Sequence, residues 1–112
     1  MKNFQFFCFL FFLCFFLIQP IQAMNLEKGK ELFYNNCTAC HMGGKNLIIP
    51  EKNLKKESLE ANGMNTIKAI RYQVINGKNG MPAFGGRLTE NEIEDIAFYI
   101  LKESNGNFLE NK

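Results

Sequence analysis

Residues 37–41, Cys-Thr-Ala-Cys-His, constrain this chain more than any other feature, because they place two thiols three positions apart and an imidazole directly after the second. This C-x-x-C-H spacing is typical of covalent haem attachment, in which both thiols form thioethers and the histidine binds the iron. A fold built on this motif has to enclose a large, flat cofactor. We therefore predict one covalent haem c held by Cys37 and Cys40, with His41 as an axial ligand of the iron.

Three other interpretations of the two cysteines stay open at this level. A structural zinc site normally uses four Cys or His ligands, and the chain after residue 23 contains only three such residues. A thioredoxin-like redox pair normally lies beside a βαβ unit, and the sequence has no such pattern. A plain disulfide between Cys37 and Cys40 is the remaining alternative, and a colourless purified protein would support it.

The N-terminal segment has the pattern of a secretory signal peptide. Lys2 is the only charged residue before Glu27, residues 4–18 are almost all apolar, and the small residue Ala23 offers a cleavage site. We predict cleavage after Ala23, which separates a signal peptide (1–23) from a single domain (24–112). An uncleaved membrane anchor is the alternative, because residues 3–26 carry no charge, but Pro20 interrupts the apolar run.

The size and charge of the mature chain exclude some classes of partner. Removal of residues 1–23 from the 112 leaves 89, close to the lower limit for a core without support from a disulfide, metal or cofactor. Without Lys2, 12 basic residues face 11 acidic ones, so the net charge is +1. This balance argues against nucleic acid as a partner. We expect a monomer with no stable membrane insertion.

Helical periodicity predicts an all-α domain of about four helices, over residues 25–36, 54–61, 65 or 66 to 76, and from Thr89 onward. The last helix has the clearest signal, because Thr89 and Glu92 form a capping box. One apolar stripe follows it, made of Ile93, Ile96, Ala97, Ile100 and Leu101. We expect loops over residues 37–53 and 78–88, where glycine and proline are frequent.

A second axial ligand has to come from a methionine, because His41 is the only histidine. Met81 is the best candidate, since it lies in the 78–88 loop and Pro82 stiffens the backbone directly after it. Met64 is the alternative, although a methionine in its position is usually core packing. Iron with two protein ligands has no open position for oxygen or peroxide, which indicates an electron carrier and argues against a haem enzyme such as a peroxidase.

Three longer segments carry a family resemblance: LEANGMNT (59–66), YQVINGK (72–78) and MPAFGGRL (81–88). With the C-x-x-C-H motif they make residues 24–112 resemble cytochrome c6, a soluble class I cytochrome of cyanobacteria and algal plastids. The resemblance implies a class I cytochrome c fold and electron transfer from the cytochrome b6f complex to photosystem I. It places the protein in the thylakoid lumen of a plastid, or in the lumen or periplasm of a cyanobacterium. A respiratory cytochrome that donates electrons to a terminal oxidase is the alternative.

The resemblance also implies roles for residues outside the motif. It places Gln73 beside the haem and the methionine ligand, and makes Arg87 a docking cation near the exposed haem edge. Asn46 and Lys52 match positions close to the haem propionates, although a solvated face is the simpler explanation of Lys52. Gly80 stands where the resemblance leads us to expect alanine, and it predicts a looser loop before Met81. The matches at Gly29, Phe33 and Tyr99 imply a crossing of the first and last helices.

Overall fold

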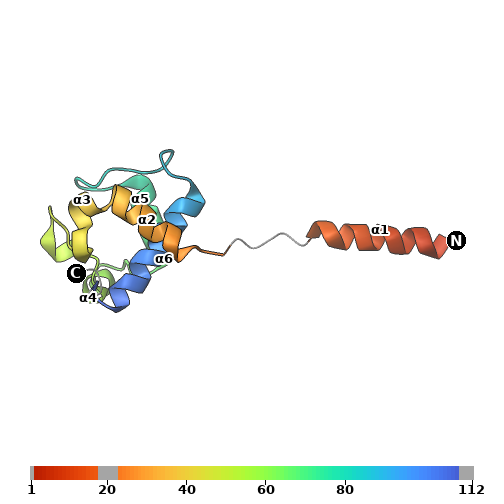
Figure 1. Ribbon diagram of the computed structural model, residues 1–112, viewed down its shortest axis with the longest axis horizontal. Coiled ribbons are helices and arrows are strands. Elements are labelled where there is room, and N and C mark those ends of the chain that lie inside the picture. Colours follow the sequence, from red (N-terminus) through yellow and green to blue (C-terminus); the bar gives the residue numbers. More distant parts are fainter. Residues whose placement is uncertain (1, 18–22, 109–112) are drawn as a thin grey trace.

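The computed structural model describes residues 2–17 and 23–108, and all the elements in these ranges are helical. Figure 1 shows helix α1 (Lys2–Leu17) apart from a globular part that contains the other helices. These are α2 (Leu26–Asn36), α3 (Thr38–His41), η1 (Met42–Gly44), η2 (Pro50–Lys52), α4 (Lys56–Ala61), α5 (Ile67–Asn76) and α6 (Glu90–Asn105). The prediction of an all-α domain is confirmed.

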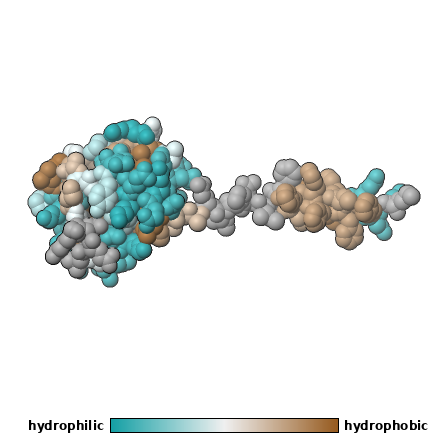
Figure 2. Space-filling view, in the orientation of Figure 1, coloured by the Kyte–Doolittle hydropathy of each residue, from teal (hydrophilic) through white to brown (hydrophobic). Residues whose placement is uncertain are grey.

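Helix α1 covers most of the predicted signal peptide. Over residues 2–15 its phenylalanine and leucine side chains are exposed, among them Phe7 and Phe11, and Figure 2 shows the apolar colour along the helix. The globular part is mainly hydrophilic in the same view. Among the described residues no helix is both long enough and apolar enough to cross a membrane. Pro20 lies outside the described residues, and cleavage after Ala23 stays a prediction.

The crossing of α2 and α6 forms the centre of the globular part. Gly29 of α2 is buried there, and a Cβ atom on it would lie 2.7 Å from the backbone carbonyl carbon of Asp95 and 3.1 Å from the Cβ of Tyr99. The ring centroids of Phe33 and Tyr99 are 5.3 Å apart. Only glycine allows so close a backbone approach, so this residue determines how α2 and α6 cross.

Helix α6 begins as the sequence predicts. The Glu92 N–H donates to Thr89 Oγ1 at 3.1 Å, and the Thr89 N–H donates to Glu92 Oε1 at 2.9 Å, which completes the capping box. The pKa of the Glu92 carboxyl is lowered, mainly by the hydrogen bond from the Thr89 backbone and secondly by the hydrogen bond with the Thr89 side chain. The predicted apolar stripe faces the core: Ile93, Ile96, Ala97 and Ile100 are buried, and Leu101 is partly buried.

The segment between α2 and α5 is more helical than predicted at its start and less so at its end. Residues 37–53, expected as a loop, contain the short turns α3, η1 and η2. Helix α4 begins at Lys56, two residues later than predicted, because the backbone of Lys55 is extended (φ −70°, ψ 154°). Single helical turns have no apolar periodicity, so the sequence pattern does not predict them.

Candidate functional site

One cavity of about 340 Å³ lies inside the globular part, a volume within the usual range for ligand pockets. Its wall is formed by α2, α3, α4, α5 and α6 and by two loops. The lining contains seven of the eight predicted site residues, namely Cys37, Cys40, His41, Asn46, Lys52, Gln73 and Met81. Much of the remaining lining is apolar, including Phe33, Ile70, Val74, Phe84 and Ile100.

The first wall carries the C-x-x-C-H motif. Helix α2 ends where the Cys37 N–H donates to the Phe33 carbonyl at 2.8 Å, and the His41 N–H donates to the Cys37 carbonyl at 2.9 Å. The motif therefore forms one helical turn, in which residues three and four positions apart lie on the same side. This turn brings Cys37, Cys40 and His41 to the cavity together.

The cysteines do not have the environment of a redox pair or of a zinc site. Both Cys37 and Cys40 are free thiols, and burial raises the pKa of the Cys37 thiol to about 11. A redox-active cysteine needs a lowered pKa, which gives the reactive thiolate. Within residues 2–17 and 23–108 no group of three or more His, Cys, Asp or Glu residues could hold a metal ion. These observations favour a thioether role over the alternatives.

The ring of His41 is held in one orientation. Its Nδ1 atom lies 2.9 Å from the backbone carbonyl oxygen of Lys45. Because a carbonyl can only accept, Nδ1 carries the hydrogen in the neutral ring, and Nε2 keeps its lone pair. A second hydrogen bond of this kind is the usual support of a metal-binding histidine. The geometry therefore leaves Nε2 of His41 available to bind iron.

A second wall carries Met81 in a tight turn. The Lys78 N–H donates to the Met81 carbonyl at 3.1 Å, and the Met81 N–H donates to the Lys78 carbonyl at 3.0 Å. Asn79 (φ 48°) and Gly80 (φ 91°) lie between them, and positive φ at both positions is typical of a type I′ turn. Glycine suits this turn, which two reciprocal hydrogen bonds close, and the looser loop expected at Gly80 stays a prediction.

The methionines differ in their contacts with the cavity. Met64 and Met81 both line it, whereas Met42 is 63% exposed and outside the lining, and Met24 borders a separate surface hollow. Lining alone does not separate Met64 from Met81. The two methionines differ in their hydrogen bonds, because Gln73 Nε2 donates to the Met81 sulfur at 3.8 Å. Gln73 therefore lies beside Met81, as the resemblance implies.

Asn46 shapes the loop that precedes η2. Its Nδ2 donates to the Lys52 carbonyl at 2.9 Å, and its Oδ1 accepts the N–H groups of Ile48 and Ile49 at 3.1 and 2.9 Å. This structural role was not predicted from the sequence. The apolar run at 47–49 could have indicated that the loop contacts the cavity, where Ile48 and Ile49 belong to the lining.

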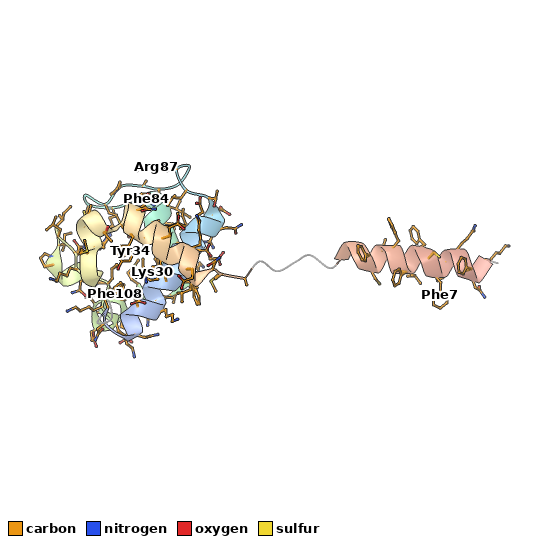
Figure 3. The ribbon with its side chains drawn as sticks, viewed as in Figure 1. Phe7, Lys30, Tyr34, Phe84, Arg87 and Phe108 are labelled. Carbon is orange, nitrogen blue, oxygen red and sulfur yellow. The ribbon has the colours of Figure 1, made fainter. Side chains whose placement is uncertain are left out.

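Arg87 is the predicted site residue that does not line the cavity. Its guanidinium carbon lies 4.8 Å from the centroid of the Phe84 ring, and Phe84 is buried and belongs to the lining. The Arg87 N–H also donates to the Phe84 carbonyl at 3.0 Å. Figure 3 labels both side chains on the same loop. Arg87 is therefore an exposed cation separated from the cavity by one aromatic ring.

The comparisons with known proteins agree with this site. A family model described as cytochrome C oxidase, cbb3-type, subunit III matches residues 24–100. Cytochrome c6 of Bumilleriopsis filiformis is 61% identical over 80 residues, 71% of this chain and 93% of that protein. Cytochrome c6 of a Synechococcus strain is 53% identical over 92 residues, 82% of each chain. The crystal structure of cytochrome c6 from the diatom Phaeodactylum tricornutum matches with a TM-score of 0.72 at 47% identity, covering 74% of this chain and 98% of that one. The predicted cytochrome c fold is confirmed.

Proposed function

Because the chain belongs to the cytochrome c6 family, we propose that it carries single electrons from the cytochrome b6f complex to photosystem I on one covalent haem c. The observation that supports this most directly is the composition of the cavity. Two free thiols, an imidazole with its Nε2 available and a thioether all line the same largely apolar space. These are the side chains that covalent attachment and two axial ligands require.

We assign a role to each of these side chains. Cys37 and Cys40 would hold the haem through two thioether bonds, and His41 Nε2 and the sulfur of Met81 would bind its iron. Bound in this way, the haem supplies reversible one-electron transfer. The apolar lining excludes water, and the thioether of Met81 donates weakly, so both favour ferrous iron and a high potential. Two protein ligands leave no open position for substrate, which is the state of a carrier rather than an enzyme.

The remaining site residues act at the margins of the cavity. We assign Asn46 and Lys52 to the haem propionates, and the bond from Asn46 Nδ2 to the Lys52 carbonyl holds the two residues close together. Arg87, exposed over Phe84, serves as the docking cation for the acceptor. We propose that residues 1–23 direct export and are then removed, and that residues 24–112 work in the thylakoid lumen.

A second candidate function has its own observation. The family model that matches is named after a subunit of a terminal oxidase. That name is compatible with a respiratory carrier that donates electrons to an oxidase. The cytochrome c6 relatives favour the photosynthetic role, because two of them are more than half identical over most of both chains. Electron-transfer kinetics can distinguish the two.

Mass spectrometry of the protein exported by a haem-attaching host tests the proposal. We expect a chain that begins at Met24, carries one haem and keeps it through acid-acetone extraction. A chain that still begins at Met1 would contradict cleavage, and an extractable haem would contradict attachment. The loaded protein should then reduce photosystem I faster than it reduces a terminal oxidase. The reverse order would support the respiratory alternative.

A further inference from the structure

The globular part contains four Asn-Gly pairs: Asn62-Gly63, Asn76-Gly77, Asn79-Gly80 and Asn105-Gly106. This dipeptide is chemically labile because the glycine amide nitrogen can attack the side-chain carbonyl of the preceding asparagine, and glycine offers no side chain to hinder it. The attack requires a glycine N–H free to lose its proton and a peptide bond free to rotate. The hydrogen bonds of each pair therefore decide how readily it reacts.

Three of the four pairs are held in place. The Gly63, Gly77 and Gly106 amides donate to the carbonyls of Glu60, Gln73 and Glu103 at 3.1, 2.7 and 3.1 Å. Two of the asparagine side chains are also engaged. Asn62 Nδ2 donates to the Ser58 carbonyl and Asn76 Nδ2 to the Tyr72 carbonyl, both at 2.8 Å. Reaction at these pairs has to break at least one hydrogen bond first.

The fourth pair has none of this protection. Both Asn79 and Gly80 are exposed, and within residues 23–108 neither the Gly80 N–H nor the Asn79 side chain has a hydrogen-bond partner. The turn is closed by the two bonds between Lys78 and Met81, which flank the Asn79–Gly80 peptide without involving it. That peptide can therefore rotate between related turn types while both closing bonds stay intact.

We propose that Asn79 is a site of spontaneous deamidation, favoured over the other three pairs. The Gly80 nitrogen loses its proton and forms a bond to Cγ of Asn79, while the Cγ–Nδ2 bond breaks and ammonia leaves with that proton. Water then opens the cyclic imide at either carbonyl and gives aspartate or isoaspartate. No electron is gained or lost, and water is the only co-reactant.

The product would change the wall of the cavity. Asn79 and Gly80 both line it, and their turn holds Met81. Deamidation adds a carboxylate there, and isoaspartate also adds one carbon to the backbone ahead of Met81. If Met81 binds the iron, as the proposed function holds, negative charge at position 79 stabilises ferric iron and lowers the midpoint potential. Molecules that have deamidated with age would then have a lower midpoint potential and be weaker oxidants.

Incubation of the haem-loaded protein in mildly alkaline buffer, followed by proteolysis and mass spectrometry, tests this proposal. We expect Asn79 to gain one mass unit about fivefold faster than any of the other three asparagines, the factor that one broken hydrogen bond sets. The same incubation in denaturant is the control, and there the four rates should converge. Equal rates in the folded protein, or a preference for Asn79 that persists in denaturant, would overturn the proposal.

Two variants complete the test. Gly80→Ala places a methyl group on the attacking residue and should slow the reaction at position 79, while the other three pairs keep their rates. An unchanged rate at position 79 would overturn the assigned chemistry. Asn79→Asp reproduces one product, and we expect a lower midpoint potential. An unchanged midpoint together with deamidation at Asn79 would overturn the stated consequence and leave the modification site standing.

Discussion

The side-chain amide of Gln73 donates to the thioether sulfur of Met81 at 3.8 Å, so that α5 touches the residue that we propose as the second axial ligand. Gln73 itself lines the cavity. A donor at the sulfur competes for the electron pair that the iron would receive, and an amide dipole at this position acts differently on ferric and ferrous haem. Helix α5 can therefore adjust the potential without supplying a ligand.

The variant Gln73→Val removes this amide and is expected to shift the midpoint potential by about 20–60 mV, because about 59 mV corresponds to roughly 1.4 kcal/mol for one electron. The haem should remain attached. Tyr72→Phe is a suitable control, since Tyr72 is the neighbouring residue on α5, is 71% exposed and lies outside the cavity lining. A redox titration of both variants checks the prediction, and an equal midpoint in Gln73→Val and the parent protein would contradict it.

Alanine variants of the two methionines that line the cavity should change different properties of the protein. Met81→Ala is expected to open one axial position, lower the potential, abolish the absorption band of methionine ligation and let cyanide or carbon monoxide bind. Met64→Ala should keep the spectrum and lose stability. Met64 is only partly buried, so we expect a loss of about 2 kcal/mol, at the low end for a truncated core side chain. Loss of the band in Met64→Ala alone would reverse our ligand assignment.

The sequence predicts best where one short motif determines the local structure. The Cys37 to His41 spacing is sufficient to place three side chains at the cavity, because one helical turn brings them together. Likewise, the Thr89 and Glu92 capping box locates the start of α6 to the residue. In both cases residues close in sequence make the deciding interactions.

Long-range packing outside the helix crossing that the resemblance implied was not predicted. Phe108 near the C-terminus is buried and occupies the space where a side chain on Gly44 would lie, and its ring centroid is 6.1 Å from that of Phe33. No local pattern indicates this packing. The type I′ turn at Gly80 was also not predicted, because the resemblance supplied an expected alanine, whereas the Asn-Gly pair itself favours this turn.

The docking role of Arg87 predicts a salt-dependent effect. Arg87→Glu reverses an exposed charge next to the cavity and should slow electron transfer to the acceptor most at low salt, because ions screen the attraction as ionic strength rises. Lys102→Glu is a matched control, since Lys102 is exposed near the end of α6 and does not line the cavity. Stopped-flow or flash kinetics over a salt series measure the effect. Equal salt dependence in both variants would remove Arg87 from the docking site.

Gly63 and Gly77 both have a positive φ, but the space around them differs. Gly63 has φ 65°, and a positive φ costs a non-glycine residue about 1–2 kcal/mol. Gly77 has φ 66° with ψ 171°, a region that almost only glycine adopts. A Cβ on Gly63 would have no neighbour within 4 Å. A Cβ on Gly77 would lie 2.5 Å from the Met81 carbonyl oxygen and 2.8 Å from the Ala83 nitrogen.

Gly63→Ala should therefore lower the unfolding free energy only by the cost of its backbone conformation, about 1 kcal/mol. Gly77→Ala has a backbone cost of its own, about 1–3 kcal/mol, because its φ and ψ suit almost only glycine. It also overpacks the segment that holds Met81, which adds about 1–3 kcal/mol. Because that segment has to move, the band of methionine ligation should weaken in Gly77→Ala and stay intact in Gly63→Ala. Denaturant unfolding and absorption spectra of the two haem-loaded variants measure both effects. If Gly77→Ala is no less stable than Gly63→Ala, the end of α5 does not fix the position of Met81.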